Sequence, residues 1–249
     1  MSKALVTGAS SGVGREMAIR LSRQGHDVVL VARNRDELTK LAESLTNASV
    51  VVADLATNEG LATVASELAD VDILINNAGF GALGDVASLS AETMHDMIHV
   101  NCTAVTELTR ACLPGMLARG RGNILNVAST AAFQPGPGMA TYYASKAYVL
   151  SFTEALAEEV RGTGVRVTAF CPGAFESGFF ATANAENSRL AKMMKLPTSA
   201  QMADAALSAM AKGRVVAIPG VTNKIGALSA RWAPKVFTRR IVHYIQGEK

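Results

Sequence analysis

Residues 4–14 read ALVTGASSGVG, a short apolar run that leads directly into a glycine-rich turn and then into a helical pattern. In such a strand-to-helix turn, backbone N–H groups and the positive end of the helix face a bound pyrophosphate. Glycine is needed wherever a side chain would block that approach. The spacing TGxxxGxG is one residue wider than the common GxGxxG pattern. The stretch therefore predicts a dinucleotide-binding βαβ unit.

Short runs rich in β-branched residues alternate with longer amphipathic stretches along the whole chain. Each run is apolar throughout, which is typical of a strand buried on both faces. Crossovers of the observed length require parallel strands and right-handed connections. We therefore predict an α/β fold, a Rossmann-like doubly wound parallel sheet of about seven strands with helices on both faces, forming a single domain over residues 1–249. The strands are expected at residues 4–7, 27–32, 49–53, 72–76, 123–128, 165–171 and 215–218, with helices at 14–23, 35–45 and 61–68 among those between them.

The end of the second predicted strand indicates which dinucleotide binds. A dinucleotide fold usually places an acidic residue there, which accepts hydrogen bonds from the ribose 2′-hydroxyl. This chain has Ala32 followed by Arg33, and a guanidinium binds a 2′-phosphate that a carboxylate would repel. NADP(H) is therefore favoured over NAD(H), with the alternative that Arg33 is only a solvated loop charge. Asp36 and Glu37 are interpreted as first-turn charges favoured by the helix dipole.

The same turn also fits a second pattern. Residues 8–12 match GxSxG, the nucleophile elbow of α/β-hydrolases, and the chain order permits a triad of Ser10, Asp204 and His243. An elbow on the first strand, however, has no preceding strand and loop to supply the second oxyanion donor. A serine hydrolase is therefore the less favoured alternative.

A tyrosine and a lysine four residues apart are candidates for proton transfer. Residues 142–146 read YYASK, so Tyr142 and Lys146 fall on one face of a helix. A tyrosine with a pKa of about 10 is a poor acid or base at neutral pH, whereas a nearby ammonium stabilises the phenolate and lowers that pKa. The pair is interpreted as a proton-transfer device, although the same spacing alone is also common on surface helices.

Several motifs occur together in one order. They are TGASSGVG at 7–14, NNAG at 76–79, Asn101, Ser129, YYASK at 142–146 and Pro172-Gly173. In this order and spacing, the sequence resembles the classical short-chain dehydrogenase/reductase family from residue 3 to about residue 220. The resemblance implies an oxidoreductase in which hydride passes directly between a nicotinamide cofactor and a carbonyl carbon.

The resemblance also implies roles for individual residues. Tyr142, the tyrosine with a lysine four residues on, would be the general acid or base at the substrate oxygen, and Ser129 would polarise the carbonyl. Lys146 would lower the tyrosine pKa and bind the nicotinamide ribose, while Asn101, in a helix kink, would hold a water that links Lys146 to solvent. No metal is required, and no metal-ligand spacing of His or Cys is present. The implied cofactor contacts are Gly8, Ser10, Ser11, Gly12, Val13, Gly14, Arg33, Asp54, Leu55, Asn77, Ala78, Gly79, Tyr142, Lys146, Pro172, Gly173 and Ser177.

Two of these assignments carry a qualification. Asp54 has a second interpretation, as a cap for the helix that follows it. Ser177 stands where the family usually has a threonine near the nicotinamide carboxamide, so the hydroxyl is kept and the methyl is lost.

The substrate pocket is expected at the carboxyl ends of the strands, from residues 80–83, 130–140 and 175–196, with a lid at about 174–198. These segments hold little fixed charge and several large apolar side chains, namely Phe133, Met139, Phe175, Phe179, Phe180, Met193 and Met194. The composition favours an apolar ketone or aldehyde. The alternative is that these side chains simply pack the lid onto the body.

Charge is distributed unevenly along the chain. Residues 212–249 hold eight Lys or Arg and one acidic residue, so this end has a net charge of +7 and the body has −4. In the basic C-terminal extension, about residues 222–249, Lys or Arg and His243 recur every four residues beside an apolar face with Trp232, and Pro234 starts or kinks a helix. Weak contact with an anionic membrane surface, docking on a partner subunit and a solvated terminal helix all stay open.

Composition excludes several classes of protein. Hydrophobic residues make up 49% of the 249 residues, which rules out disorder, and no run reaches the roughly 18 apolar residues of a membrane span. No basic segment with interleaved aromatics suggests a nucleic-acid partner. Three cysteines without a CxxC pair are typical of a reducing compartment, so a cytoplasmic location is expected.

These observations predict an NADP-dependent oxidoreductase that interconverts a small carbonyl compound and its alcohol. A homo-oligomer, a dimer or tetramer, is expected with it. A non-catalytic NADP-binding regulatory protein is the alternative from another class, because a fold alone does not fix its chemistry.

Overall fold

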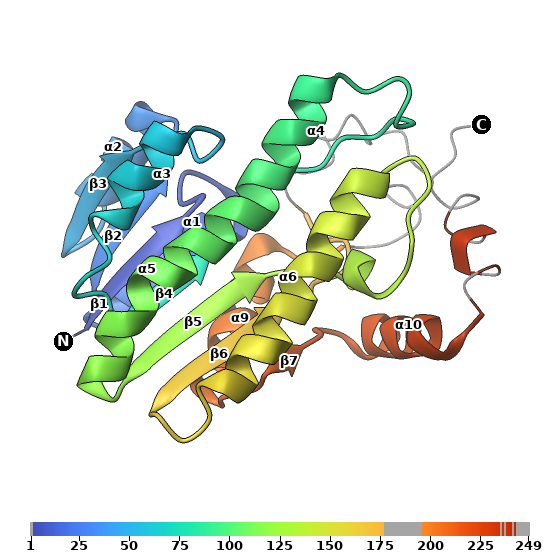
Figure 1. The fold of residues 1–249 in the computed structure, drawn as a ribbon. Coiled ribbons are helices and arrows are strands. Elements are labelled where there is room, and N and C mark those ends of the chain that lie inside the picture. Colours follow the sequence, from blue (N-terminus) through green and yellow to red (C-terminus); the bar gives the residue numbers. More distant parts are fainter. Residues whose placement is uncertain (1, 177–195, 235, 237, 241, 243–249) are drawn as a thin grey trace.

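Seven parallel strands form one sheet in the computed structural model, which describes residues 2–176, 196–234, 236, 238–240 and 242 (Figure 1). Their order is β3-β2-β1-β4-β5-β6-β7, so the chain starts in the middle, fills one half and then returns to fill the other. The doubly wound sheet predicted from the sequence is confirmed. Its order reverses between β1 and β4, where such sheets form a ligand crevice at the carboxyl ends of the strands. The strands are β1 (Lys3–Thr7), β2 (Asp27–Ala32), β3 (Ala48–Val52), β4 (Ile73–Asn76), β5 (Gly122–Val127), β6 (Val165–Phe170) and β7 (Val216–Ala217).

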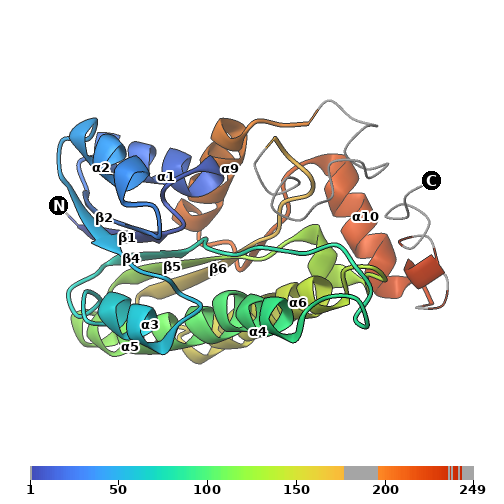
Figure 2. The same ribbon diagram turned by 90° about the horizontal axis from the view of Figure 1, so that it is seen from above.

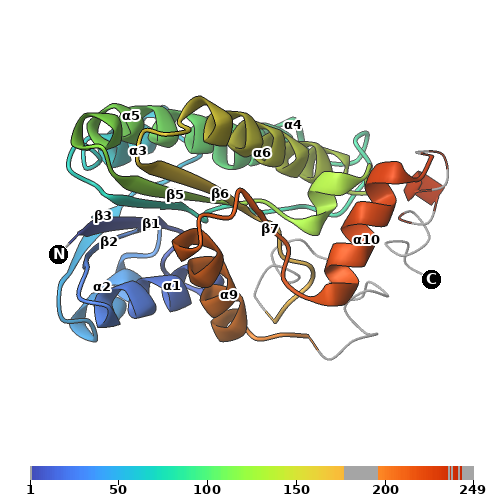
Figure 3. The ribbon, with the colours of Figure 1, turned by 90° about the horizontal axis from the view of Figure 1, so that it is seen from below.

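Helices cover both faces of the sheet (Figures 2 and 3). On one face lie α1 (Gly12–Arg23), α2 (Arg35–Glu43) and α9 (Ser199–Ala211). On the other lie α3 (Asn58–Ala65), α4 (Ala91–Ile98), α5 (Ala104–Arg119) and α6 (Ala140–Glu159). The π-helical turn η1 (His99–Thr103) joins α4 to α5, and the 3-10 turn η2 (Thr130–Phe133) follows β5.

Alternate residues of the central strands enter two separate hydrophobic clusters. Val6 of β1 and Leu30 of β2 pack under α1 and α9, whereas Leu5 and Val29 pack under α3 and α5. Successive side chains of a strand point to opposite faces, so only a strand that is apolar at every position can fill both clusters. This is why the strands appear in the sequence as continuous apolar runs.

Local signals account for where the helices begin. The predicted start of α1 was residue 14, but the helix begins at Gly12 because the glycine-rich turn itself forms its first residues. Asn34 caps α2 by accepting a hydrogen bond from the Glu37 N–H, and Asp36 and Glu37 lie in the first turn, as predicted. The first turn of a helix favours acidic side chains because its N–H groups carry partial positive charge.

The C-terminal part of the chain extends past the sheet edge at β7. Helix α10 (Val221–Trp232) lies there and contacts η2 (Figure 1). It ends before Pro234, and the Thr238 N–H donates to the Pro234 carbonyl, so a second helical piece starts at the proline, as predicted. The four-residue basic repeat therefore does not run along one continuous helix. None of the helices in the described ranges is long and apolar enough to cross a membrane.

Candidate active site

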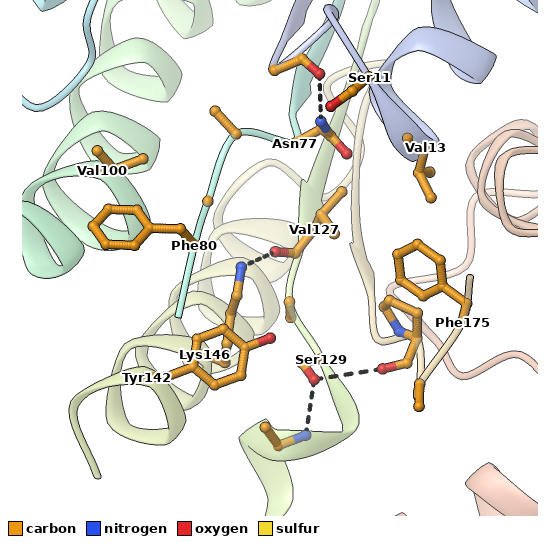
Figure 4. Close-up of a pocket in the computed structure, with 18 of the residues that line it drawn as sticks. Ser11, Val13, Asn77, Phe80, Val100, Val127, Ser129, Tyr142, Lys146 and Phe175 are labelled. Atoms are coloured by element: carbon orange, nitrogen blue, oxygen red, sulfur yellow. Dashed lines mark hydrogen bonds between the residues drawn. The ribbon is translucent and has the colours of Figure 1, made fainter. Parts of the chain in front are cut away.

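A cavity of about 840 Å³ opens at the carboxyl ends of the strands, where the strand order reverses (Figure 4). Sixteen of the predicted catalytic and cofactor-binding residues line it. They are Gly8, Ser10, Ser11, Gly12, Val13, Arg33, Asp54, Leu55, Asn77, Ala78, Gly79, Ser129, Tyr142, Lys146, Pro172 and Gly173. Gly14 and Asn101 are not part of the lining, and Ser177 lies outside the described residues.

The turn between β1 and α1 leaves backbone donors open to this cavity. Ser11 is the N-cap of α1, yet its side chain accepts no hydrogen bond from the first turn. Gly12 has φ +56, and among the described residues a β-carbon built there would have only Ser199 Oγ within 4.0 Å. Backbone N–H groups at the start of a helix, next to a position with this much room, fit a dinucleotide pyrophosphate.

Gly14 serves the packing of this turn, not its lining. A β-carbon at Gly14 would lie 2.4 Å from both Asn77 Nδ2 and the Gly8 carbonyl oxygen. The Asn77 amide in turn donates to the Thr7 carbonyl at 2.9 Å and the Gly8 carbonyl at 3.3 Å. Asn77 therefore ties the end of β4 to this turn, the predicted phosphate-binding turn, and Gly14 leaves room for that connection. The structure thus gives Gly14 a supporting role, and its direct contact with the cofactor stays a prediction.

At the other end of the cavity, Arg33 lies on the rim with a side chain that is 78% exposed. Its Nη1 is 3.9 Å from Asp54 Oδ2, and Asp54 Oδ1 accepts a hydrogen bond from the Ala56 N–H. The N-cap of α3 is Thr57, which accepts from the Gly60 N–H. The interpretation of Asp54 as that cap is therefore wrong, because Asp54 turns the loop before the helix and faces the cavity. An exposed guanidinium at this rim fits a 2′-phosphate.

Helix α6 and strand β5 bring the proposed proton-transfer residues together. The Lys146 ammonium is buried and donates to the Val127 carbonyl at 2.8 Å, while its Nζ lies 5.8 Å from the centre of the Tyr142 ring. Ser129 accepts from the Ala131 N–H at 3.1 Å, which fixes its hydroxyl beside the same ring (Figure 4). Three of the four residues predicted as catalytic, Ser129, Tyr142 and Lys146, therefore share one wall of the cavity.

Burial controls the pKa values of Tyr142 and Lys146. It raises the pKa of Tyr142 to about 12, against a smaller lowering by the hydrogen bond with Ser129. Burial also lowers the pKa of Lys146 to about 8, because the charged ammonium loses water. The sequence predicted a lowered tyrosine pKa, and the direction here is the opposite, since desolvation penalises the phenolate more than its neighbours stabilise it.

Asn101 supports the site from behind the cavity wall. It lies in the π-helical turn, where the resemblance implied a kink. Its amide NH₂ donates to the Phe80 carbonyl and the Ser145 hydroxyl, both at 2.9 Å, and its Oδ1 accepts from the Phe80 N–H at 3.1 Å. A β-carbon on Gly79 would lie 2.9 Å from that Oδ1 and 3.2 Å from Lys146 Nζ. Asn101 therefore fixes the loop after β4 beside the lysine.

The buried lysine makes the stability of the protein depend on pH. Between pH 8 and pH 9, Lys146 loses its proton in the folded state, whereas its pKa of 10.5 keeps it charged when unfolded. Because Lys146 binds more protons in the unfolded state in this window, this residue alone should raise the free energy of unfolding of cofactor-free protein by about 1 kcal/mol. The raised pKa values of Cys102, Cys112 and Cys171 act in the opposite direction from about pH 8, because these thiols, with an ordinary pKa of 9.0, begin to ionise there in the unfolded state only. The contribution of Lys146 is therefore measured against a variant that lacks the lysine.

Urea unfolding of the unmodified protein and of Lys146→Met at several pH values measures this contribution. The difference between their free energies of unfolding should change by about 1 kcal/mol from pH 8 to pH 9 in favour of the unmodified protein. The corresponding difference for Lys40→Met, at an exposed position on α2, should not change with pH. A difference between the unmodified protein and Lys146→Met that is constant across this pH range would contradict the assignment.

The structure places some of the residues predicted for the substrate pocket in the wall of the cavity. Phe80, Leu83, Met139, Phe175 and Leu196 line the cavity. Phe133, expected there, packs instead against the core between β6 and α6. Phe179, Phe180, Met193, Met194 and most of the predicted lid lie outside the described residues.

A further part of the cavity wall was not predicted from the sequence. Thr222 and Asn223 at the start of α10, together with Val242, also line the cavity. The Asn223 amide lies against Gly173, where a β-carbon would approach it to 2.5 Å. No local pattern predicts this, because the return of a C-terminal segment over a cavity depends on tertiary packing.

The hydrolase alternative finds no support in the described residues. Asp204, its proposed acid, lies on α9 and pairs with Arg20 through Nε and Nη2. Ser10 lines the cavity described above, and His243 lies outside the described residues.

Comparison with known proteins agrees with the geometry. The sequence matches the short chain dehydrogenase family over residues 2–188. It is 39% identical over 177 residues to the NADP-dependent 3-hydroxy acid dehydrogenase YdfG of Escherichia coli K12, covering 68% of this chain and 71% of that protein. A short-chain dehydrogenase from Sphingobium yanoikuyae, solved in complex with NADPH, superposes with a TM-score of 0.85 at 34% identity over 92% of each chain.

A second solved structure is the bulky-bulky ketone specific alcohol dehydrogenase from Comamonas testosteroni. It has a TM-score of 0.79 and 32% identity, and the match covers 92% of this chain and 91% of that one. The family predicted from the motifs is thus confirmed, and this chain belongs to the short-chain dehydrogenase family.

Proposed function

We propose that the protein is an NADP(H)-dependent oxidoreductase that interconverts an apolar ketone or aldehyde and the corresponding alcohol. The observation that carries the proposal is the shared wall of Ser129, Tyr142 and Lys146 in a cavity that also contains the phosphate-binding turn. A cofactor bound at that turn supplies or accepts the hydride. The protein contributes position and a proton.

Ser129 and Tyr142 act at the substrate oxygen. The Ser129 hydroxyl is fixed by the Ala131 N–H and lies beside Tyr142, so both hydroxyls can hydrogen-bond one carbonyl oxygen. Burial keeps Tyr142 protonated at neutral pH, and the residue therefore donates its proton as negative charge develops on that oxygen during reduction. In the reverse direction, the same oxygen takes the proton from the alcohol.

Lys146 and Asn101 position this group. Lys146 is held by the Val127 carbonyl, and its ammonium stabilises negative charge on the nearby phenol oxygen and binds the nicotinamide ribose. Asn101 holds the loop at Phe80, which closes the cavity next to Lys146. We propose this positioning role for Asn101 together with the water relay that the resemblance implies.

The substrate end of the cavity is apolar. Leu83, Met139, Phe175 and Leu196 carry no charge, so they favour hydrocarbon groups on the carbonyl carbon. The alcohol dehydrogenase of Comamonas testosteroni, described as specific for bulky-bulky ketones, has the same fold. We therefore place ketones with an apolar group on each side of the carbonyl first among the substrates.

A panel of carbonyl compounds, followed by NADPH absorbance, tests this proposal. Apolar ketones should be reduced with higher kcat/KM than hydroxy- or carboxy-substituted analogues of the same length. A preference for the charged analogues would contradict the substrate class, and no turnover with any carbonyl would favour the non-catalytic alternative. The cytoplasmic location and the homo-oligomer expected from the sequence stay predictions.

The rim guanidinium should determine the choice of dinucleotide. We expect NADPH to bind more tightly than NADH, and Arg33→Ala should narrow that preference by about 1–3 kcal/mol, the range for a charge-assisted hydrogen bond. Dissociation constants of both dinucleotides measure the difference. Lys40→Ala removes another exposed cation from the next helix and should leave the preference unchanged. Equal affinities of the unmodified protein for NADPH and NADH would refute the assignment.

A further inference from the structure

Helix α10 presents a continuous apolar stripe to the outside of the molecule. Val221, Ile225, Leu228 and Trp232 follow one another at intervals of four, three and four residues, which places them on one face of a helix. Val221 is 76% exposed, Ile225 60% and Trp232 86%. We call these four side chains the α10 stripe.

The opposite face of α10 is the one that contacts the protein. Ala227 is buried, and Asn223 packs over Gly173 at the cavity wall. These residues lie on the far side of the helix from the stripe, because 3.6 residues complete one turn. The side of α10 that faces the body therefore carries small and polar side chains, and the exposed α10 stripe faces away from the body.

The C-terminal segment that carries the stripe is basic. Lys224 lies on α10 beside the stripe, and Arg239 and Arg240 are exposed on the helical piece that follows Pro234. Helix α10 contains no acidic residue, and the chain from residue 212 to its end carries a net charge of +7. An exposed apolar helix face in a basic segment, with tryptophan among its apolar residues, matches the helices that lie in a membrane interface.

A second copy of the chain fits this surface less well. A symmetric interface places the same patch of both subunits in contact, so two basic segments would face each other. A stable protein interface also needs roughly 20 residues on each side, whereas the stripe offers four large side chains. An anionic surface offers both complementary charge and an apolar phase for the stripe.

We propose that α10 docks the protein on anionic lipid bilayers, with the α10 stripe in the interface and the neighbouring cations on the lipid headgroups. Docking is peripheral and reversible, because a short amphipathic helix inserts only into the headgroup region. It is also weakened by salt, since exposed charges are screened beyond about 10 Å at 0.1 M ionic strength.

The single tryptophan of the chain reports this docking directly. The full-length protein is mixed with vesicles of phosphatidylcholine alone or with one third phosphatidylglycerol, at low and at high salt. With anionic vesicles at low salt, we expect the protein to sediment with the lipid and the Trp232 emission to shift to the blue. Brominated acyl chains should quench that emission.

Two sets of variants separate the apolar and the electrostatic contributions. Replacing Val221, Ile225 and Leu228 by serine removes the stripe but keeps Trp232 and the cations, and should abolish the blue shift. Replacing Lys224, Arg239 and Arg240 by glutamine should weaken partitioning about a hundredfold, because each cation near an anionic surface contributes a factor of about five.

Matched controls carry the same changes elsewhere on the surface. Val86→Ser with Leu117→Ser removes exposed apolar side chains outside α10, and Lys40→Gln with Arg161→Gln removes exposed cations. Both controls should sediment like the unmodified protein.

Three outcomes would overturn the proposal. The first is no lipid-dependent sedimentation at low salt, and the second is sedimentation indifferent to lipid charge. The third is a blue shift of Trp232 that depends on protein concentration without lipid and disappears in the serine variant. That last result would assign the α10 stripe to a second copy of the chain.

Discussion

Replacing Tyr142 by phenylalanine is expected to lower kcat by about 10² to 10⁴-fold, the usual contribution of a positioned proton donor. Only the phenol oxygen is lost, because the ring keeps its edge-to-face contact with Tyr143 and its place against Met139. The dissociation constant of NADPH should therefore change little. Steady-state kinetics with an apolar ketone and a separate titration of NADPH measure the two quantities.

Tyr143 provides a closely matched control. It is the next residue on α6, it also lines the cavity, and burial raises its pKa to about 12 as well. Tyr143→Phe should nevertheless keep turnover, because the residue four positions on from Tyr143 is Ala147. If Tyr143→Phe abolishes turnover and Tyr142→Phe does not, the other tyrosine is the acid. If both variants stay fully active, the proton-transfer assignment fails.

Replacing Gly14 by alanine is expected to lower the free energy of unfolding by about 3 kcal/mol, the upper part of the usual range for overpacking. The new β-carbon would be 2.4 Å from a backbone oxygen and from a hydrogen-bonded amide, so α1 must move away from β4. The same movement should widen the phosphate-binding turn and weaken NADPH binding.

Gly226 provides the comparison for this substitution. It lies inside α10, and in the described part of the chain no atom would lie within 4 Å of a β-carbon built there. Gly226→Ala should raise the free energy of unfolding by about 0.4–1 kcal/mol, because alanine restricts the unfolded chain and favours the helix. Denaturant unfolding of both variants measures the difference. Equal changes in the free energy of unfolding would show that the close contacts at Gly14 are not the reason for a glycine at that position.

The fold could be predicted from the sequence because its main signals are local. The continuous apolar runs at β1, β2 and β4 are a direct result of burial on both faces of the sheet. The ends of individual strands and helices were predicted less exactly. β7 has two residues, Val216–Ala217, where four were expected, since pairing with β6 determines how much of an edge run becomes a strand.

The location of the candidate-site residues could be predicted where a motif has its own chemistry, and less well where tertiary packing determines which residues line the cavity. Ser129, Tyr142 and Lys146 converge on one wall because β5 and α6 carry them there. The pKa of Tyr142 could not be predicted from its neighbour Lys146, because desolvation depends on the whole cavity. The contribution of Asn223 and Val242 to the wall arises from contacts that no sequence period encodes.

The π-helical turn at His99–Thr103 has a consequence for how the chain tolerates insertions and deletions. Its i to i+5 hydrogen bond, from the Ala104 N–H to the His99 carbonyl, accommodates one residue more than an α-turn. Loss of one residue from the turn would restore a regular α-turn and leave α4 and α5 on their present faces, because the wide turn takes up the extra residue locally. The side chains inside the turn would change direction instead, so the Asn101 amide should no longer be held at Phe80. The length of this segment therefore matters to the site as much as the identity of the residues in it.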